Sequence, residues 1–246
     1  MPIIYLSPST QEYNMYTGGG SEEYYMNLIA DAMIPYLQSS GIRYVRNNKS
    51  MSAADSIRAS NSGNFGLHLA IHSNAAPDGM YGTKQGVDVY YARGSANGRR
   101  AAEIFAENMK SIYPNPSLVR AVATTSIGEV MLTRAPAVFM EIGYHDNTAD
   151  ANWIRNNIEA IARNLVLSVT QFFGVPFINA TPAREAIVRV SYGNLNLRSK
   201  PDLSSSVIAR MPNGTRVSVL GEWQGWAVVR YGGYTGYSDS RYLEFV

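Results

Sequence analysis

Short apolar runs alternate with amphipathic helical patterns over the first two-thirds of the chain. Apolar runs of four to eight residues bounded by loop-type residues indicate strands buried on both faces. Such runs lie at residues 2–6, 42–47, 67–72, 86–92 and 137–143. Apolar residues at helical spacing predict helices over residues 22–41, 51–64, 97–114 and 148–174. Strands that alternate with helices predict an α/β fold with a mostly parallel sheet flanked by helices.

The pattern changes after Gly174. Residues 175–185 form a Pro-containing connector with little periodicity, and residues 186–246 contain only short runs separated by turn signals. Turns at this spacing are typical of a small all-β barrel. We therefore expect one domain over residues 1–174, a linker over 175–185 and a barrel domain over 186–246.

Composition narrows the classes of function. The chain has 246 residues, a formal net charge of +2 and no dense stripe of Lys and Arg, so nothing favours a nucleic-acid partner. There is no cysteine, which removes disulfides and thiolate metal ligands together. No stretch approaches the ~20 apolar residues of a membrane span. The first residues, MPIIYLSPSTQ, lack the basic and apolar regions of a signal peptide.

His72 and Glu141 each end an apolar run and are followed at once by loop-type residues. The carboxyl ends of parallel strands meet at the edge where open α/β sheets bind ligands. A His and a Glu delivered to that edge suit a metal ion and a general base. Either residue alone is explained by a hydrogen bond at a strand end, but the pair in matching contexts favours a site.

Several short motifs carry a resemblance to known proteins. They are SEEYYMNLIA with Glu23 and Asn27, Arg58 with Asn61, AIHSNA with His72 and Asn74, GVDVYY, and PAVFMEIGYHDN. With these, residues 1–174 resemble the zinc-dependent N-acetylmuramoyl-L-alanine amidases that cleave bacterial peptidoglycan. The segments LNLRSKP and MPNGTRVSVLGEWQGWAVVRYGGYTGY make residues 186–246 similar to bacterial SH3-like wall-targeting domains.

The resemblance implies a reaction and a set of roles. The amidases use zinc-activated water to cleave the amide between N-acetylmuramic acid and L-alanine of the stem peptide. His72 and Glu23 match two of the family's ligands for Zn²⁺, and Glu141 matches its catalytic Glu. Asn74, His145 and Arg58 are expected at the substrate. His145 could instead bind zinc or form only a local hydrogen bond.

The amino-terminal segment departs from the family's pattern. The family carries Asp-Pro-Gly-His-Gly after its first strand, and that His is the third zinc ligand, whereas this chain has LSPSTQEYN. Gln11 or Glu12 is the nearest replacement, and Gln11 lies closer to the strand end. His68 cannot share an ion with His72, because four residues of strand span roughly 13 Å. The alternative function is a non-catalytic wall-binding protein with a degenerate amidase fold.

The expected partner is bacterial peptidoglycan, with no nucleic acid and no membrane span, and we expect a monomer. The expected location is the cell wall or the extracellular space after release. A phage lysin, a mother-cell lytic enzyme and an autolysin all remain compatible with the sequence.

Overall fold

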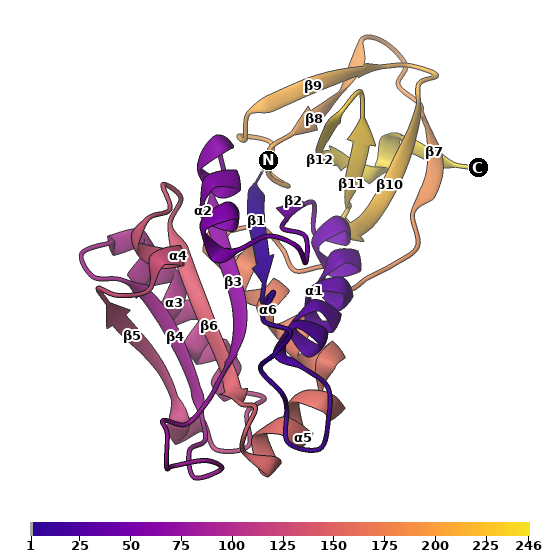
Figure 1. The fold of residues 1–246 in the computed structure, drawn as a ribbon. Helices are drawn as coiled ribbons and strands as arrows, with labels where there is room; N and C mark the ends of the chain where they lie inside the picture. The colour runs from indigo at the N-terminus through magenta and orange to yellow at the C-terminus, as the bar shows by residue number, and fades with distance from the viewer. Residues whose placement is uncertain (1) are drawn as a thin grey trace. The chain divides into compact units, whose positions relative to one another are not determined.

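The computed structural model describes residues 2–246, which form two compact units (Figure 1). The α/β unit comprises Ile3–Met33 and Tyr44–Phe172. The barrel unit comprises Pro2, Ile34–Arg43 and Phe173–Val246. Among the described residues, no helix is long and apolar enough to cross a membrane.

The α/β unit is built on a six-stranded sheet of order β2-β1-β3-β6-β4-β5. The strands are β1 (Ile3–Pro8), β2 (Arg43–Arg46), β3 (Leu67–Asn74), β4 (Val87–Ala92), β5 (Val119–Thr124) and β6 (Ala137–Tyr144). The pairs β1–β3, β3–β6 and β4–β5 are parallel, whereas β4 and β6 are antiparallel. The first seven residues of β3 are all buried, as expected of a central strand covered on both faces. The prediction of a mostly parallel sheet flanked by helices is confirmed.

Six helices surround this sheet. They are α1 (Glu22–Ser39), α2 (Ala53–Ser62), α3 (Ala96–Lys110), α4 (Gly128–Met131), α5 (Thr148–Asn156) and α6 (Ile158–Phe173). A capping box fixes the start of α2, because Ser52 accepts from the backbone of Asp55 and the Asp55 carboxylate accepts from the backbone of Ser52.

The prediction of a single helix over residues 148–174 is wrong in one respect. The structure has two helices there, α5 and α6, which meet at Asn157. Asn157 leaves helical backbone geometry, with φ −128° and ψ 22°, and its side-chain amide donates to the Trp153 carbonyl. An Asn side chain competes with the helix for backbone hydrogen bonds, which interrupts the helix at this point.

The barrel unit contains a seven-stranded sheet of order β13-β7-β10-β11-β12-β8-β9. Its strands are β7 (Arg184–Val188), β8 (Asn194–Arg198), β9 (Val207–Pro212), β10 (Arg216–Trp223), β11 (Trp226–Tyr231), β12 (Tyr234–Asp239) and β13 (Leu243–Phe245). All of its pairs are antiparallel. Alternate residues of these strands fill one apolar core, which includes Val188, Leu197, Val217 and Val229. The expected all-β region is confirmed.

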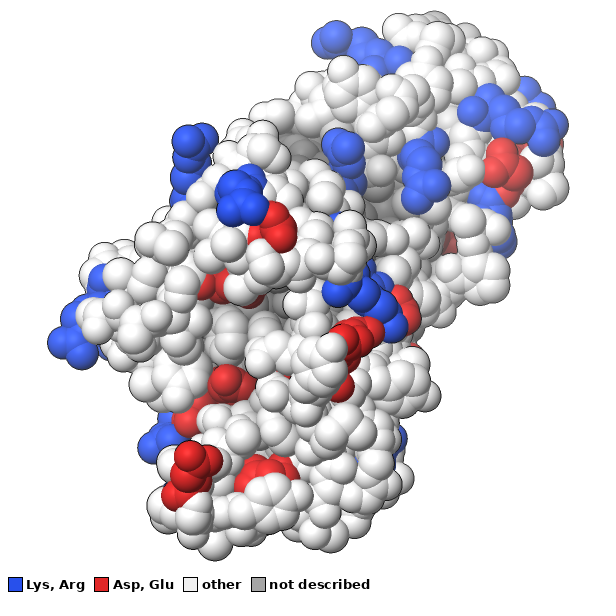
Figure 2. All heavy atoms as spheres, in the orientation of Figure 1, with Lys and Arg blue, Asp and Glu red and all other residues white. Residues whose placement is uncertain are grey.

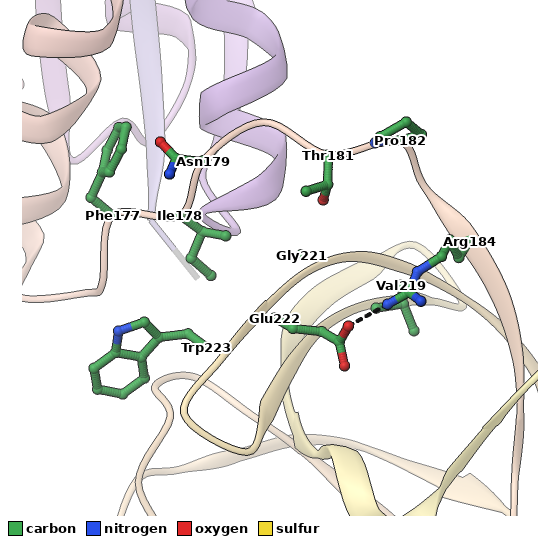
Figure 3. Close-up of a pocket in the computed structure, with 10 residues that line it drawn as sticks. All are labelled: Phe177, Ile178, Asn179, Thr181, Pro182, Arg184, Val219, Gly221, Glu222 and Trp223. Atoms are coloured by element: carbon green, nitrogen blue, oxygen red, sulfur yellow. Dashed lines mark hydrogen bonds and ion pairs between the residues drawn. The ribbon is translucent and has the colours of Figure 1, made fainter.

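The barrel strands contact Ser40 and the connector, which both precede the barrel in the sequence. Tyr237 is fully buried, and its hydroxyl donates to the Ser40 carbonyl at 2.8 Å. A cavity of about 490 Å³ lies between the connector and β10, and Figure 3 shows its lining. The charged side chains there, Arg184 and Glu222, are paired with each other, so the cavity offers no unpaired acid or base (Figure 3).

Candidate active site

The strand register brings the two residues singled out in the sequence together. His72 lies directly opposite Glu141 in the parallel β3–β6 pair, and Asp88 lies opposite Glu141 in the antiparallel β4–β6 pair. Residues that are directly opposite in a ladder project from the same face of the sheet. An imidazole and two carboxylates therefore form a row across three neighbouring strands. The His72 ring also stacks on Phe139, with centroids 4.3 Å apart.

Two polar side chains contact His72, and a third links them to each other. Its Nδ1 lies 2.7 Å from Glu22 Oε1, and the amide nitrogen of Gln11 lies 3.2 Å from the same Nδ1. The amide of Asn14 donates to Glu22 Oε2 at 2.7 Å and to Gln11 Oε1 at 2.8 Å. The first helical turn of α1 and the loop after β1 thus supply the groups that face the end of β3.

The structure places Glu22, and not Glu23, against His72. Glu22 is buried, while Glu23 points to the ammonium of Lys49, with Nζ 2.9 Å from Oε1. Consecutive helical residues are about 100° apart around the axis, so only one of the two can face the sheet. Both carboxylates lie in the first turn of α1, and the family's motif alone did not decide between them.

Glu141 is half-buried, and one of its carboxylate oxygens is fully buried and unsatisfied. Its Oε2 has no hydrogen-bond partner among the described residues. Burial raises the pKa of Glu141 to about 8; the charge of His72 opposes this, and the carboxylates of Glu22 and Asp88 add to it. A carboxylate with a pKa near neutrality can both accept and return a proton at working pH.

The pKa values of His72 and Glu22 shift in opposite directions. Burial disfavours the charged imidazolium of His72, but the hydrogen bond and the charge of Glu22 outweigh it and raise the pKa. Burial likewise acts against the charged form of Glu22, yet the hydrogen bond and the charge of His72, with help from Asn14, lower its pKa. The pair therefore prefers the charged state, with a proton on His72 that a metal ion would have to displace.

Of the three residues predicted to contact the substrate, His145 and Asn74 lie near the candidate site and Arg58 does not. His145 is buried beside the site, with Nδ1 3.2 Å from the Ser73 hydroxyl and 3.1 Å from the Ser73 carbonyl. Asn74 accepts the backbone N–H of His145 at 2.8 Å through its carbonyl. Arg58 is exposed on α2 and pairs with Asp55, and no described contact joins it to His72 or Glu141.

One buried carboxylate organises the loop that follows Glu141. Asp150 accepts hydrogen bonds from the Tyr113 hydroxyl at 2.6 Å, from the backbone of Tyr144 at 2.9 Å and from the backbone of Gly86 at 3.1 Å. Gly86 has φ 123°, and a Cβ there would lie 2.6 Å from the Leu118 carbonyl oxygen. The start of β4 and the end of β6 are thus fixed to α5 through a single side chain.

The side chains that face His72 fit a metal ion with a reduced ligand set. Residues 2–246 contain no group of three His, Cys, Asp or Glu side chains that could hold an ion. Glu22 and His72 supply two strong ligands, and the Gln11 amide supplies a weaker third once its oxygen replaces its nitrogen. The two orientations of an amide have nearly the same shape. Glu22 Oε1 and the Gln11 amide lie 2.7 and 3.2 Å from His72 Nδ1, so the three groups meet at the end of β3.

Comparison with known proteins identifies the families of the two regions. The N-acetylmuramoyl-L-alanine amidase family model matches residues 10–171, and the bacterial SH3 domain model matches residues 193–244. The chain belongs to the N-acetylmuramoyl-L-alanine amidase family, whose members are peptidoglycan hydrolases, and it carries a bacterial SH3 domain. No curated protein matches the chain at a significant level.

Solved structures share the fold of the α/β unit. An N-acetylmuramoyl-L-alanine amidase from Clostridium difficile 630 superposes with a TM-score of 0.61 at 16% identity, covering 70% of this chain and 97% of that one. AmiC2 of Nostoc punctiforme gives a TM-score of 0.61 at 15% identity, with coverage of 70% and 97%. The catalytic domain of CwlV from Bacillus (Paenibacillus) polymyxa var. colistinus gives 0.61 at 15% identity, with coverage of 72% and 100%.

Proposed function

We propose that the α/β unit hydrolyses the amide between the lactyl group of N-acetylmuramic acid and L-alanine, with Glu141 as the general base. The observation that carries this proposal is the buried, unpartnered Oε2 of Glu141 on the same sheet face as His72. Burying a carboxylate without a partner is costly, and such groups concentrate at functional sites. A protein that only bound the wall would gain nothing from that cost.

We propose that Glu22, His72 and the Gln11 amide hold a zinc ion. A bound zinc ion would supply Lewis-acid polarisation of the substrate carbonyl. Glu141 would take a proton from the attacking water and return it to the nitrogen of the leaving alanine. Asn14 positions Glu22, because its amide donates to Glu22 Oε2. His145, buried at the side of the site, is proposed as a hydrogen-bonding group for the substrate.

We propose that the barrel directs the enzyme to the wall. Residues 173–246 carry eight Lys and Arg against five Asp and Glu. Figure 2 shows basic side chains, in blue, on the face of the barrel that it presents. An excess of positive charge favours approach to an anionic polymer. Bacterial peptidoglycan and its attached polymers are the proposed partner, and the cell wall is the proposed place of action.

Digestion of purified walls tests the catalytic proposal. Mass analysis of the fragments should show peptides with a free amino-terminal alanine and glycans with intact lactyl groups. Glu141→Gln should reduce the release of these peptides by ~10²–10⁴-fold, since its amide cannot accept a proton at neutral pH. Glu107→Gln is the matched control, because Glu107 is an exposed residue on α3.

The alternative reading predicts a different result. A wall-binding protein with a degenerate site would sediment with walls but release no new amino termini. Equal release by the wild type and Glu141→Gln would instead assign the chemistry to another residue.

A further inference from the structure

A groove of about 710 Å³ opens beside the candidate active site. Residues from three segments line it: Thr10, Gln11, Glu12, Tyr13 and Asn14 after β1, Glu23 in the first turn of α1, and Lys49 and Ser50 in the turn after β2. Two of these residues belong to the site itself, because Gln11 faces His72 and Asn14 donates to Glu22. The groove therefore adjoins the side chains that contact His72 and Glu22.

The groove contains a lysine ammonium as well as carboxylates. Lys49 contributes one cation, and Glu12 and Glu23 contribute two anions. Lys49 Nζ lies 2.9 Å from Glu23 Oε1, and this is its only ion pair among the described residues. An ammonium has three N–H donors, so two remain for a ligand. The Glu23 side chain is only 14% exposed, so its carboxylate holds the Lys49 ammonium at the groove wall. The Lys49 side chain is 62% exposed and therefore accessible to a ligand.

The substrate has two sides, and their charges differ. The glycan side is uncharged around the scissile amide. On the peptide side, L-alanine is followed by a γ-linked glutamate whose α-carboxyl is free in some walls and amidated in others. That group lies within ~7 Å of the scissile nitrogen along the chain. A groove that adjoins the candidate site and presents the Lys49 ammonium suits the peptide side.

We propose that this groove binds the stem peptide, and that Lys49 recognises the free α-carboxylate of its second residue. The inference deepens the proposed function and rests on it for the identity of the substrate. Glu23, which the motif suggested as a zinc ligand, is in this view a positioning residue that holds Lys49 in place. The chain thereby distinguishes walls with a free α-carboxylate from walls with an α-amide.

Direct binding tests the proposal without turnover. The probes are two N-acetylmuramoyl dipeptides, one with the free α-carboxylate and one with the α-amide. Their dissociation constants are measured by calorimetry with the zinc-loaded full chain in the Glu141→Gln background. We expect the carboxylate to bind about three- to fivefold more tightly than the amide, the size of an exposed ion pair. Adding Lys49→Gln should abolish this preference, chiefly by weakening the carboxylate.

Lys110→Gln is the matched control, because Lys110 forms a similar exposed pair with Glu107 on α3. This variant should keep the preference. Equal binding of the two dipeptides in the Glu141→Gln background, or a preference that survives Lys49→Gln, would overturn the proposal and favour the glycan as the occupant. Failure of the proposed function has a separate signature, which is the absence of new amino-terminal alanine after the wild type acts on walls.

Discussion

Asp88 lies directly opposite Glu141 across the antiparallel β4–β6 pair, and of the two carboxylates only Asp88 pairs with an arginine. Arg120 donates from Nε to Asp88 Oδ1 at 3.0 Å and from Nη2 to Asp88 Oδ2 at 3.1 Å. The charge of Asp88 is therefore compensated at the sheet face, whereas Glu141 has no such partner. Burial therefore raises the pKa of Glu141 with no arginine beside it to oppose the shift.

Glu141 should make the metal-free protein less stable as pH rises. Its pKa is about 8 in the folded chain and ~4.3 when unfolded, so the unfolded chain releases the proton first. The free energy of unfolding should fall between pH ~4.5 and ~8. Glu141→Gln removes this loss and should be more stable than the wild type at pH 8.5, on the order of a few kcal/mol. Near pH 4.5 the two should be equal.

Denaturant midpoints in the presence of a strong chelator provide the measurement. Glu107→Gln, with an exposed carboxylate, should follow the wild type at every pH. A Glu141→Gln curve parallel to that of the wild type would show that Glu141 titrates normally.

Glu22→Gln and Glu23→Gln form a matched pair that separates the ligand from its neighbour. The first replaces the carboxylate that faces His72 Nδ1, so zinc affinity should fall at least tenfold. The second changes only the partner of Lys49 and should leave zinc content unchanged. Elemental analysis after dialysis against a weak chelator measures both. Loss of zinc in Glu23→Gln alone would restore the assignment made from the motif.

If Gln11 is the proposed third ligand, its replacement should change the affinity for zinc. Gln11→His would place a nitrogen where the amide now lies 3.2 Å from His72 Nδ1, and zinc should bind at least tenfold more tightly because imidazole is the better ligand. Gln11→Ala should weaken binding instead. Competition with a fluorescent zinc chelator gives the dissociation constants. If neither variant changes the affinity, Gln11 is not a ligand.

Tyr237 should contribute to stability through one hydrogen bond. Its hydroxyl donates to the Ser40 carbonyl at 2.8 Å, and both groups are buried. Tyr237→Phe should lower the free energy of unfolding by about 1–2 kcal/mol, since the carbonyl loses its donor. Tyr234→Phe is the control, because Tyr234 is exposed. Thermal melting of the full chain would show whether the two variants differ.

Strand positions were predictable because buried strands have a simple signature. The runs at residues 67–72 and 137–143 are apolar on both faces, and they became β3 and β6. The edge strand β5 escaped prediction, since two of its six residues are exposed and only its two end residues are buried. The antiparallel pairing of β4 with β6 also was not predicted, because alternation of strands and helices does not fix direction at every pair.

The side chains that lie together at the candidate site differ from the predicted set by one residue of α1, because Glu22 and not Glu23 faces His72. His72 and Glu141 follow from the ends of apolar runs, and register then makes them neighbours. The choice between Glu22 and Glu23 depends on the rotation of the first helical turn, which the loop after β1 sets through Asn14. That rotation is a tertiary property, so local sequence could not supply it.

The Asp150 side chain makes the opening of the segment around β6 measurable. It holds the N–H groups of Gly86 and Tyr144, neither of which relies on a helix for protection. Amides bound to a buried carboxylate exchange with deuterium only when the surrounding segment opens. Their exchange rates therefore measure how often the loop beyond Glu141 separates from β4. The measurement requires neither substrate nor metal.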